Sequence, residues 1–366
     1  MLQQLTLTHF RHVDSARWSD LAPVNILLGQ NGAGKTNIME AISLLSPGKG
    51  LRGGNPEQWR RQQNGPNAVW AINGLLQDDI DAISLATGSP QSNPTSSKRI
   101  VSINQVPQST QQILADYLAI VWLTPQMDGL FLADSSERRR FFDRLIYALY
   151  PDHAKYLGRY DHALRQRNKL LKDRQRDVFW YKALHQTMAG PAVAIAAARL
   201  DTLAQFNGWI DQTDLNMPLP LLSVKGPVEE LLLQHSASQV EQMLIDLWQQ
   251  ALTDDLQSGS TSLGPHRSDF SALYRAKNID ASFCSTGEQK SLLLSLILAH
   301  AHGVRQQVPG RPLIVLLDDI AAHFDEERRG QLYDFLPATG AQIFLSGTDK
   351  NDFDGIIGNA KVIQIQ

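Results

Sequence analysis

Apolar residues form short continuous runs in some parts of the chain and recur at helical spacing in others. The run 24–28 predicts a short buried strand, and residues 37–45 carry apolar positions at the spacing of one helix face. Near the C-terminus, residues 312–319 predict a second buried strand that ends in two carboxylates, and residues 341–346 and 361–365 predict strands that close the sheet. Strands that alternate with helices in this way indicate an α/β domain.

Alternating and short apolar segments also occur in the first third of the chain. Residues 5–10 alternate like a half-buried strand. The segments 69–76, 82–86 and 100–103 predict antiparallel strands joined by polar turns, of which residues 88–97 form the longest. These segments predict a β-rich lobe.

After Pro125 the apolar residues recur at helical spacing instead of alternating as in strands. Residues 137–149 predict a helix that ends before Pro151, and a long helical stretch follows from about residue 153 to 185. Residues 189–212 predict an alanine-rich helix that packs inside a bundle.

From residue 264 the chain returns to elements like those of its first part. With 366 residues, the chain is long enough for two domains. We expect a discontinuous head of residues 1–130 plus 262–366, and a helical arm of residues 131–261 inserted into it.

Charge is distributed unevenly, although the formal net charge is only −3. Segment 155–182 holds nine Lys or Arg against three Asp, with five aromatic residues between them. The cations are Lys155, Arg159, Arg165, Arg167, Lys169, Lys172, Arg174, Arg176 and Lys182. This excess suits contact with the phosphate backbone of DNA, and a solvated helix face is the alternative. Segment 228–260 has six acidic residues and no Lys or Arg, and it is expected either to pack beside the basic helices or to bind a protein partner.

One cysteine, Cys284, excludes an intrachain disulfide and a multi-cysteine metal site. No apolar run approaches the length that spans a membrane, and the N-terminus lacks the basic and then apolar pattern of a targeting segment. We therefore expect a cytoplasmic protein with no membrane partner.

Residues 29–36 match the phosphate-loop pattern G-x-x-x-x-G-K-[ST] in full, between the predicted strand and helix that such a loop requires. Its glycines allow successive backbone N–H groups to face one concavity, where a di- or triphosphate would lie. Lys35 would reach the β- and γ-phosphate oxygens, and the Thr36 hydroxyl would ligate Mg²⁺. The predicted nucleotide contacts are Gly29, Gln30, Asn31, Gly32, Ala33, Gly34, Lys35, Thr36 and Asn37.

Two carboxylates, Asp318 and Asp319, follow the apolar run near the C-terminus. Asp318 is predicted to hold Mg²⁺ together with Thr36, and Asp319 to orient or deprotonate the attacking water. Such a pair is weak evidence alone, and it gains weight from the complete phosphate loop earlier in the chain.

The segment 285–290, with the sequence STGEQK, opens a strongly apolar predicted helix. It is similar to the signature loop of ABC-type ATPases, in the variant carried by SMC-like chromosome and repair proteins. That resemblance assigns Ser285, Gly287 and Glu288 to the γ-phosphate of a nucleotide held by another subunit. An ordinary serine-capped helix is the alternative. Because the chain has one phosphate loop and one signature, the resemblance implies that ATP joins two chains into a homodimer.

From end to end, the chain resembles the RecF family of bacterial recombination-mediator ATPases. Besides the nucleotide motifs, the matching segments are Phe10-Arg11, residues 138–143 (RRRFFD), residues 264–269 (GPHRSD) and Asp325. The resemblance implies an α/β fold: an ABC/SMC-type P-loop ATPase head with a β-rich lobe and an inserted helical arm. It also implies a nucleotide contact for Arg11, and a structural or phosphate-contact role for His266 and Arg267.

RecF-like proteins bind double-stranded DNA beside single-stranded gaps as ATP-closed dimers in DNA replication, repair and the SOS response. With RecR and RecO they help to place RecA on DNA coated by single-strand binding protein. The resemblance therefore implies ATP and Mg²⁺ as cofactors, and duplex DNA, gapped DNA and RecR as partners. It also implies weak, DNA-stimulated ATP hydrolysis that times reopening of the dimer. Asp319 is one methylene shorter than the glutamate of transporter ATPases, which is compatible with slow turnover.

Some positions depart from the family pattern. Gln126 stands where an acidic residue is usual, and it is similar to the glutamine near Mg²⁺ and water in other ABC proteins, which makes it a candidate catalytic and metal-contacting residue. Residues 322–325 differ from the usual D-loop, and residues 346–349 carry no switch histidine, as in RecF relatives and unlike transporter ATPases. The alternatives are the ATP-binding subunit of a transporter, a non-hydrolysing ATP-gated DNA clamp and, more remotely, a small-molecule P-loop kinase.

Overall fold

The computed structural model describes residues 1–65, 67–77, 81–212, 217–320 and 324–365. The chain divides into two compact units. The first contains Met1–Asp128 and Lys290–Gln366 with a short segment that ends at Met217, and the second contains Gly129–Gln212 and Pro218–Gln289. In the described residues, no helix is long and apolar enough to cross a lipid bilayer.

A parallel sheet lies in the first unit. Among the described residues its strands are, in spatial order, β14 (Lys361–Gln364), β3 (Val24–Leu28), β13 (Gln342–Gly347), β12 (Leu313–Leu317) and β8 (Ala119–Leu123). All neighbouring strands are parallel. Every residue of β3, β12, β13 and β8 is buried, as expected of a parallel sheet covered on both faces. The strands predicted over residues 24–28, 312–319, 341–346 and 361–365 are confirmed as β3, β12, β13 and β14. Strand β8 was not predicted from the sequence.

The second sheet of this unit is antiparallel. Its described strands, in spatial order, are β2 (Val13–Trp18), β1 (Leu2–Phe10), β4 (Ala71–Gln77), β5 (Ala82–Gly88), β6 (Ile100–Ile103) and β7 (Val106–Gln108). The predicted β-rich lobe is confirmed, and the polar residues after Gly88 connect β5 to β6.

Helix α1 (Lys35–Ser43) packs between the two sheets of the first unit, where it contacts β1 of one sheet and β13 and β8 of the other. Ile38 and Ile42 are buried in the same core as Trp70 and Phe344. The helix that follows the phosphate loop is thus held by packing on both sides.

Three short helices and one long helix are the other described helices of the first unit. They are α2 (Pro56–Trp59), α3 (Leu114–Tyr117), α11 (Glu326–Phe335) and α10 (Thr286–Gln307), whose first residues belong to the second unit. The 3-10 turns of this unit are η1 (Gln62–Asn64), η2 (Gln111–Ile113), η3 (Pro125–Met127), η8 (Leu336–Thr339), η9 (Lys350–Phe353) and η10 (Ile357–Asn359).

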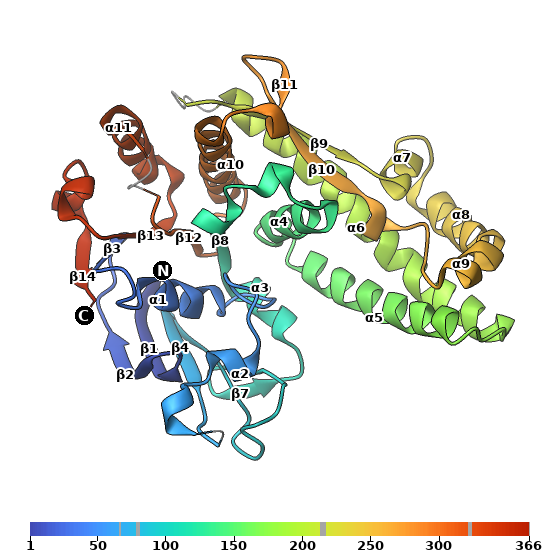
Figure 1. Ribbon diagram of the computed structural model, residues 1–366, viewed down its shortest axis with the longest axis horizontal. Coiled ribbons are helices and arrows are strands. Elements are labelled where there is room, and N and C mark those ends of the chain that lie inside the picture. Colours follow the sequence, from blue (N-terminus) through green and yellow to red (C-terminus); the bar gives the residue numbers. More distant parts are fainter. Residues whose placement is uncertain (66, 78–80, 213–216, 321–323, 366) are drawn as a thin grey trace. The chain divides into compact units, whose positions relative to one another are not determined.

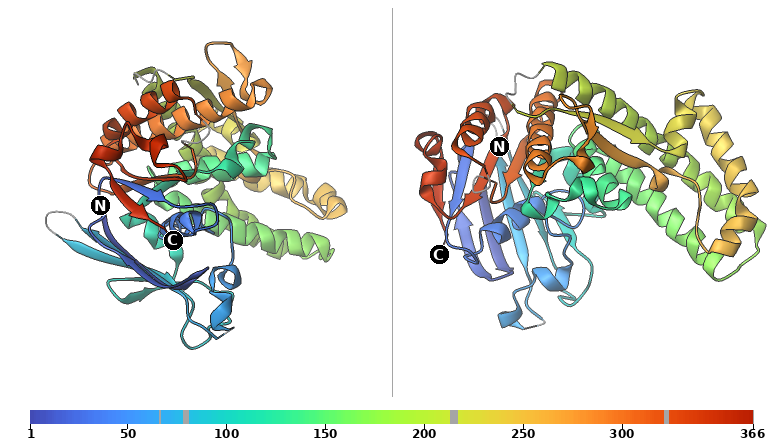
Figure 2. Two further views of the ribbon diagram at one scale, coloured as in Figure 1. Left: turned by 60° about the vertical axis from the view of Figure 1, so that its left-hand side comes forward. Right: turned by 45° about the horizontal axis from the view of Figure 1, so that its top comes forward.

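The second unit is built on two long helices, α5 (Asp152–Lys172) and α6 (Val178–Gln212), which lie side by side (Figures 1 and 2). Tyr160, Met188 and Ile195 share a buried core with Trp248. The other elements are α4 (Ser135–Tyr147), α7 (Pro227–Leu232), α8 (Ala237–Gln250), α9 (Leu252–Ser258), η4 (Leu130–Leu132), η5 (Pro265–Arg267), η6 (Ala281–Phe283), β9 (Pro220–Lys225), β10 (Asp269–Tyr274) and β11 (Ile279–Asp280).

The boundary of the second unit differs from the one expected for the helical arm. Strand β10 pairs with β9 along its whole length and also pairs with β11. Because β10 pairs with β9 and packs against α4, residues 262–289 join the second unit, which ends at Gln289 rather than at residue 261.

The helical stretch expected over residues 153–185 is interrupted, and that prediction is corrected. Helix α5 ends at Lys172, and α6 begins at Val178 and continues as one helix through Pro191 to Gln212. Arg174 has a left-handed φ of 51°, which ends α5. The Asp177 carboxylate accepts hydrogen bonds from the backbone N–H groups of the next turn, as an N-cap does.

One of the nine cations in the basic segment is not at the surface. Arg167 is fully buried and donates a 2.7 Å hydrogen bond to Asp255, whose side chain is also buried. A second buried arginine, Arg199, pairs with Asp143 at 2.9 Å and with Glu229 at 3.2 Å. Two carboxylates of the acidic segment therefore pair with arginines of α5 and α6, which favours the first of the two interpretations of that segment.

Candidate nucleotide-binding site

The phosphate loop joins β3 to α1 through two glycines with left-handed backbones. Gly32 and Gly34 have φ values of 85° and 104°, and side chains at these positions would be strained. Gly29 is required for a different reason, because a Cβ there would lie 2.5 Å from the carbonyl oxygen of Ile365, which follows β14. The backbone of the loop is thus fixed both by its own conformation and by the adjacent strand.

Lys35, the first residue of α1, is 7% exposed and points back along the loop. Its ammonium donates hydrogen bonds to the backbone oxygen of Gly29 at 2.6 Å and to that of Gln30 at 3.0 Å. The ammonium of Lys35 is therefore held at the phosphate loop, where phosphate oxygens would bind.

A hydrogen-bonded group joins the loop to the ends of two strands. The Thr36 hydroxyl donates to Asp318 Oδ1 at 3.3 Å, and the Ser346 hydroxyl donates to the same oxygen at 2.6 Å. Ser346 Oγ also accepts from the backbone N–H of Asp319 at 2.8 Å. The carboxyl ends of β12 and β13 thus bring the acidic pair to the start of α1. The motifs predict neither Ser346 nor its bonds.

A cavity of about 210 Å³ opens at this group. It is lined by His12, Asn31, Gly32, Gly34, Lys35, Thr36, Asn37, Arg52, Asp318 and Asp319. Arg52, from the glycine-rich turn after α1, donates a 2.9 Å hydrogen bond to the Asn37 side chain. In the sequence, residues 47–54 form a glycine-rich turn whose Lys49 and Arg52 fit a solvated loop and a phosphate or DNA contact equally well. The sequence carried no signal for His12.

Arg11 is next to His12 in the chain but is not among the described residues that line the cavity. Its guanidinium donates to both oxygens of Glu40, at 2.8 and 2.7 Å, and the Glu40 side chain is fully buried in α1. Trp59 Nε1 donates to the same carboxylate at 3.3 Å. In this arrangement Arg11 positions α1, and a direct nucleotide contact for it stays a prediction.

Gln126 lies in η3, directly after β8, with an exposed side chain. It is not among the described residues that line the cavity. The D-loop segment falls partly outside the described residues, and its last residue, Asp325, caps α11 by accepting from the Arg328 backbone N–H at 2.9 Å. The roles predicted for Gln126 and for the D-loop stay predictions.

The signature loop belongs to the second unit and begins α10. Glu288 accepts hydrogen bonds from the backbone N–H and the hydroxyl of Ser285, both at 2.9 Å, and forms an ion pair with Lys277. These bonds lower the pKa of Glu288 to about 2, with the Lys277 ammonium as the largest cause. The exposed Ser285 and the partly exposed Glu288 thus form an N-terminal cap, with Gly287 in the first turn of the helix.

Two segments that carried the family resemblance, residues 138–143 and 264–269, contact one another in the second unit. Arg138 holds Asp269 through two hydrogen bonds of 2.8 and 2.6 Å. His266 Nδ1 lies 2.8 Å from the hydroxyl of Tyr160, and its Nε2 lies 3.1 Å from the Thr261 carbonyl oxygen. Burial lowers the pKa of His266 to about 4. These contacts favour the structural of the two roles predicted for His266.

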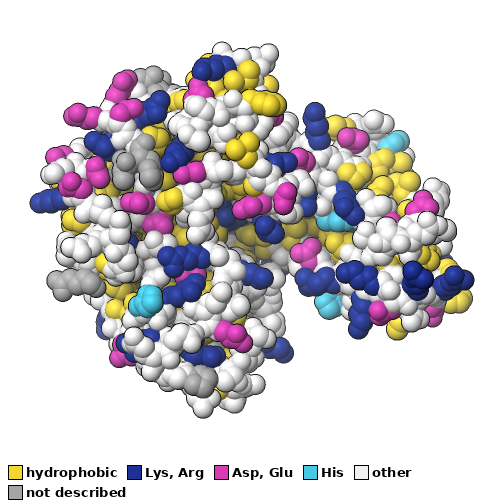
Figure 3. Space-filling model, viewed as in Figure 1, with side chains coloured by type: hydrophobic (Ala, Val, Ile, Leu, Met, Phe, Trp, Pro, Cys, Tyr) yellow, Lys and Arg dark blue, Asp and Glu magenta, His cyan; other side chains and the backbone are white. Residues whose placement is uncertain are grey.

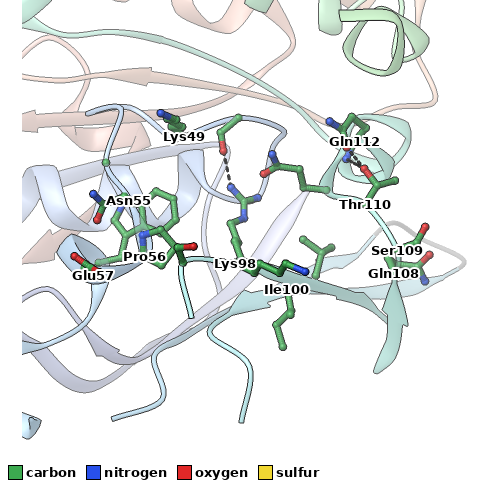
Figure 4. A pocket seen from close by; sticks show the side chains of 17 residues that line it. Lys49, Asn55, Pro56, Glu57, Lys98, Ile100, Gln108, Ser109, Thr110 and Gln112 are labelled. Atoms are coloured by element: carbon green, nitrogen blue, oxygen red, sulfur yellow. Dashed lines mark hydrogen bonds between the residues drawn. The ribbon is translucent and has the colours of Figure 1, made fainter. Parts of the chain in front are cut away.

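A larger cavity, of about 640 Å³, lies in the β-rich lobe (Figure 4). Lys49, Lys98 and Glu57 line it, and Arg99 donates at 2.8 Å to the backbone oxygen of Gly48 in its wall. None of the nucleotide motifs contributes to this lining. The smaller cavity, which gathers the phosphate loop and the acidic pair, is therefore the candidate nucleotide site.

Known proteins resemble this chain along its whole length. The RecF DNA replication and repair protein of Rhizobium rhizogenes is 38% identical over 357 residues, which cover 97% of this chain and 94% of the relative. The RecF protein of Mesorhizobium japonicum is 37% identical and covers 100% of this chain and 96% of the relative. No protein-family model matches the chain.

Solved structures agree on the fold. A RecF recombination mediator of the RecFOR pathway, solved with ATP, superposes with a TM-score of 0.79 at 24% identity over 97% of this chain and 95% of that one. An SMC head bound to the winged-helix domain of ScpA superposes with a TM-score of 0.52 at 13% identity, over 99% of this chain and 94% of that one. The predicted fold, an ABC/SMC-type P-loop ATPase head with a β-rich lobe, is confirmed. Because identities above 35% extend over nearly the full length of curated relatives, this chain belongs to the RecF family of DNA replication and repair proteins.

Proposed function

We propose that this chain binds ATP with Mg²⁺, closes into a homodimer on ATP binding, and binds duplex DNA beside single-stranded gaps. With RecR and RecO, it would then help to load RecA. The observation that carries the proposal is the hydrogen-bonded group of Thr36, Asp318, Ser346 and Asp319 at a complete phosphate loop. A RecF relative of the same fold has been solved with ATP, which supports the nucleotide.

The residues at the cavity fit a magnesium nucleotide. Open space lies where a Cβ of Gly32 would be, so the backbone leaves room for phosphate oxygens. The Thr36 hydroxyl and the Asp318 carboxylate are the hard oxygen donors that Mg²⁺ prefers, and these two residues would hold it. When bound, the ion would offset the negative charge of the phosphates. Lys35 would contribute a second positive charge after exchanging its carbonyl partners for phosphate oxygens.

The signature loop supports a site completed by a second chain. Ser285 is exposed, and its hydroxyl is held by Glu288 within the same turn of helix. One chain carries one phosphate loop and one signature, so two copies would form two complete sites. ATP held by one copy would then be bound by Ser285 of the other.

Slow hydrolysis is proposed as the step that reopens the dimer. Asp319 has a left-handed φ of 54°, and its buried Oδ1 has no hydrogen-bond partner among the described residues. An unpaired buried carboxylate oxygen costs free energy, and such costs are found at functional sites. This supports a water-orienting role over the passive clamp. The transporter alternative has no support from the family to which the chain belongs.

The first experiment measures mass by light scattering, without nucleotide, with ADP and with ATP. We expect a dimer only with ATP, and a monomer under all conditions for Lys35→Ala and Ser285→Arg. Ser238→Arg adds the same charge on the exposed face of α8 and should dimerise normally. A mass that does not respond to ATP contradicts the shared site.

The second experiment measures phosphate release with and without duplex DNA. We expect slow release that DNA stimulates, and loss of that stimulation in Asp319→Asn. Asp334→Asn, at an exposed position of α11, serves as the control. Release no faster than the background rate in the wild type, with and without DNA, would favour the passive clamp.

A further inference from the structure

The turn between α5 and α6 exposes two adjacent aromatic side chains. Phe179 is 86% exposed and Trp180 is 61% exposed, and Phe179 is the most exposed large apolar side chain of the described residues. Every residue from Lys172 to Trp180 is exposed. We call residues 172–182 the hairpin tip. Large rings are rarely left in water without a reason, because their burial contributes much to stability.

The backbone of the hairpin tip is held firmly in place. The fully buried Tyr181 donates a 3.1 Å hydrogen bond from its hydroxyl to the backbone oxygen of Gln175. Asp177 Oδ1 accepts from the backbone N–H groups of Phe179 and Trp180, at 2.9 and 3.3 Å. The two rings therefore project from a fixed turn of helix, and a ligand would not have to order the backbone first.

Positive charge surrounds the rings. Lys172, Arg174, Arg176 and Lys182 are exposed within the hairpin tip. Of the two acidic residues there, Asp177 is engaged as the N-cap of α6. Lys and Arg side chains also gather along α5, at the lower right of Figure 3. A polyanion is thus the partner that this charge pattern fits.

The aromatic rings beside the cations favour single-stranded over double-stranded nucleic acid as the partner. In a duplex the base faces are stacked on one another, so a duplex offers phosphates to the cations and nothing to the rings. Unpaired nucleotides offer both phosphates and free base faces, and aromatic side chains in basic surroundings are the usual platform for them. Trp, Phe and Arg also occur at protein interfaces, but the surplus of cations favours nucleic acid.

We propose that the hairpin tip binds single-stranded DNA by stacking unpaired bases on Phe179 and Trp180, while its Lys and Arg residues contact the flanking phosphates. The inference rests on the proposed binding of gapped DNA and adds a function to it: the tip recognises the unpaired strand beside the duplex. It predicts that the protein distinguishes a gap from continuous duplex by base stacking.

The test uses the full-length protein with ATP and two DNA molecules, a continuous duplex and a duplex with a single-stranded gap. The gap carries 2-aminopurine, whose fluorescence falls when it stacks. We expect the wild type to quench the probe, and Phe179→Ala and Trp180→Ala each to weaken binding to the gapped DNA by about 5- to 150-fold. Trp180→Phe should keep most of the quenching. Binding to the continuous duplex should change less than about twofold in all three variants.

Each other outcome has a definite meaning. If both alanine variants bind both DNA molecules as the wild type does, or if the probe is not quenched, the stacking site is wrong. If they lose both DNA molecules equally, the rings serve general docking and the inference is also wrong. If DNA binding is unchanged but binding to purified RecR or RecO is lost, the tip is a protein interface instead. If the wild type binds no duplex at all, the proposed function itself fails.

Discussion

Removal of the Arg11 guanidinium should leave the Glu40 carboxylate buried without its main partner. The Glu40 side chain is 0% exposed and accepts hydrogen bonds of 2.8 and 2.7 Å from Arg11, with a third, of 3.3 Å, from Trp59. Deleting one partner of a buried ion pair typically costs about 3–5 kcal/mol. The Arg11 side chain is 19% exposed, so water can replace part of it. We therefore expect Arg11→Ala to lower the free energy of unfolding of the first unit by about 3 kcal/mol.

A change at Glu40 distinguishes the effect of Arg11 on stability from an effect on nucleotide binding. Glu40→Gln removes the buried charge, so Arg11→Ala combined with Glu40→Gln should recover most of the stability lost in Arg11→Ala alone. Urea denaturation of the four proteins measures this coupling, and titration with a fluorescent ATP analogue measures affinity. If Arg11 acts only by positioning α1, affinity recovers together with stability. If Arg11 contacts the nucleotide, affinity stays low in the stable double variant.

A matched control lies on the neighbouring strand. Arg17 of β2 is bonded to Gln4 at an exposed site, and Arg17→Ala should change the free energy of unfolding by less than about 1 kcal/mol. The reasoning fails if Arg11→Ala unfolds at the same urea concentration as the wild type. It fails equally if the double variant is no more stable than Arg11→Ala, because Glu40 would then not depend on its partner.

Three further changes test other parts of the structure. Burial, with Arg167 nearby, lowers the pKa of His185 to about 4 from 6.5, so the unfolded chain binds the proton first. Stability should therefore fall between pH 6.5 and 4, by about 2 kcal/mol at pH 5. His185→Gln should lose this part of the pH dependence in urea unfolding at pH 7.5 and 5, and identical pH slopes would contradict it. Gly29→Ala places a Cβ 2.5 Å from the Ile365 carbonyl oxygen and should destabilise by about 1–3 kcal/mol in thermal unfolding, whereas an added Cβ at Gly129 meets open space. Ser346→Ala removes the hydroxyl that holds the acidic pair and should weaken calorimetric binding of Mg²⁺-ATP by about 10- to 100-fold, with no difference in EDTA.

The sequence predicted well those elements whose structure depends on residues close to one another in the chain. The strand, loop and helix around residues 24–43 follow from a buried run, glycines and an apolar helix face, all within one short segment. The buried strands β12 and β13 were equally clear, because a sheet covered on both faces requires continuous apolar runs. Local chemistry was therefore sufficient for β3, β12, β13 and β14 and for the phosphate loop, whereas β8 was not predicted.

The elements that the sequence missed depend on distant partners. The turn at residues 173–177 contains no Gly or Pro, and only Asp177, an acceptable N-cap, marked the start of α6. Arg167 looked like one more surface cation, since its partner Asp255 lies 88 residues further along the chain. The boundary at residue 261 was placed too early because the pairing of β9 with β10 joins segments far apart in the sequence.

Contacts between residues far apart in the sequence also support the candidate site, because they hold α1 along its length and not only at the phosphate loop. Arg99 donates to the backbone oxygens of Leu44, Ser46 and Gly48, at 2.7 to 3.0 Å, and so satisfies carbonyl groups after the C-terminal end of α1. The pair of Arg11 and Glu40 holds the middle of the same helix. A phosphate cradle made of backbone N–H groups binds strongly only if those groups are already aligned, because each one that must be ordered reduces the affinity. We therefore expect the β-rich lobe to contribute to nucleotide affinity through the rigidity of α1.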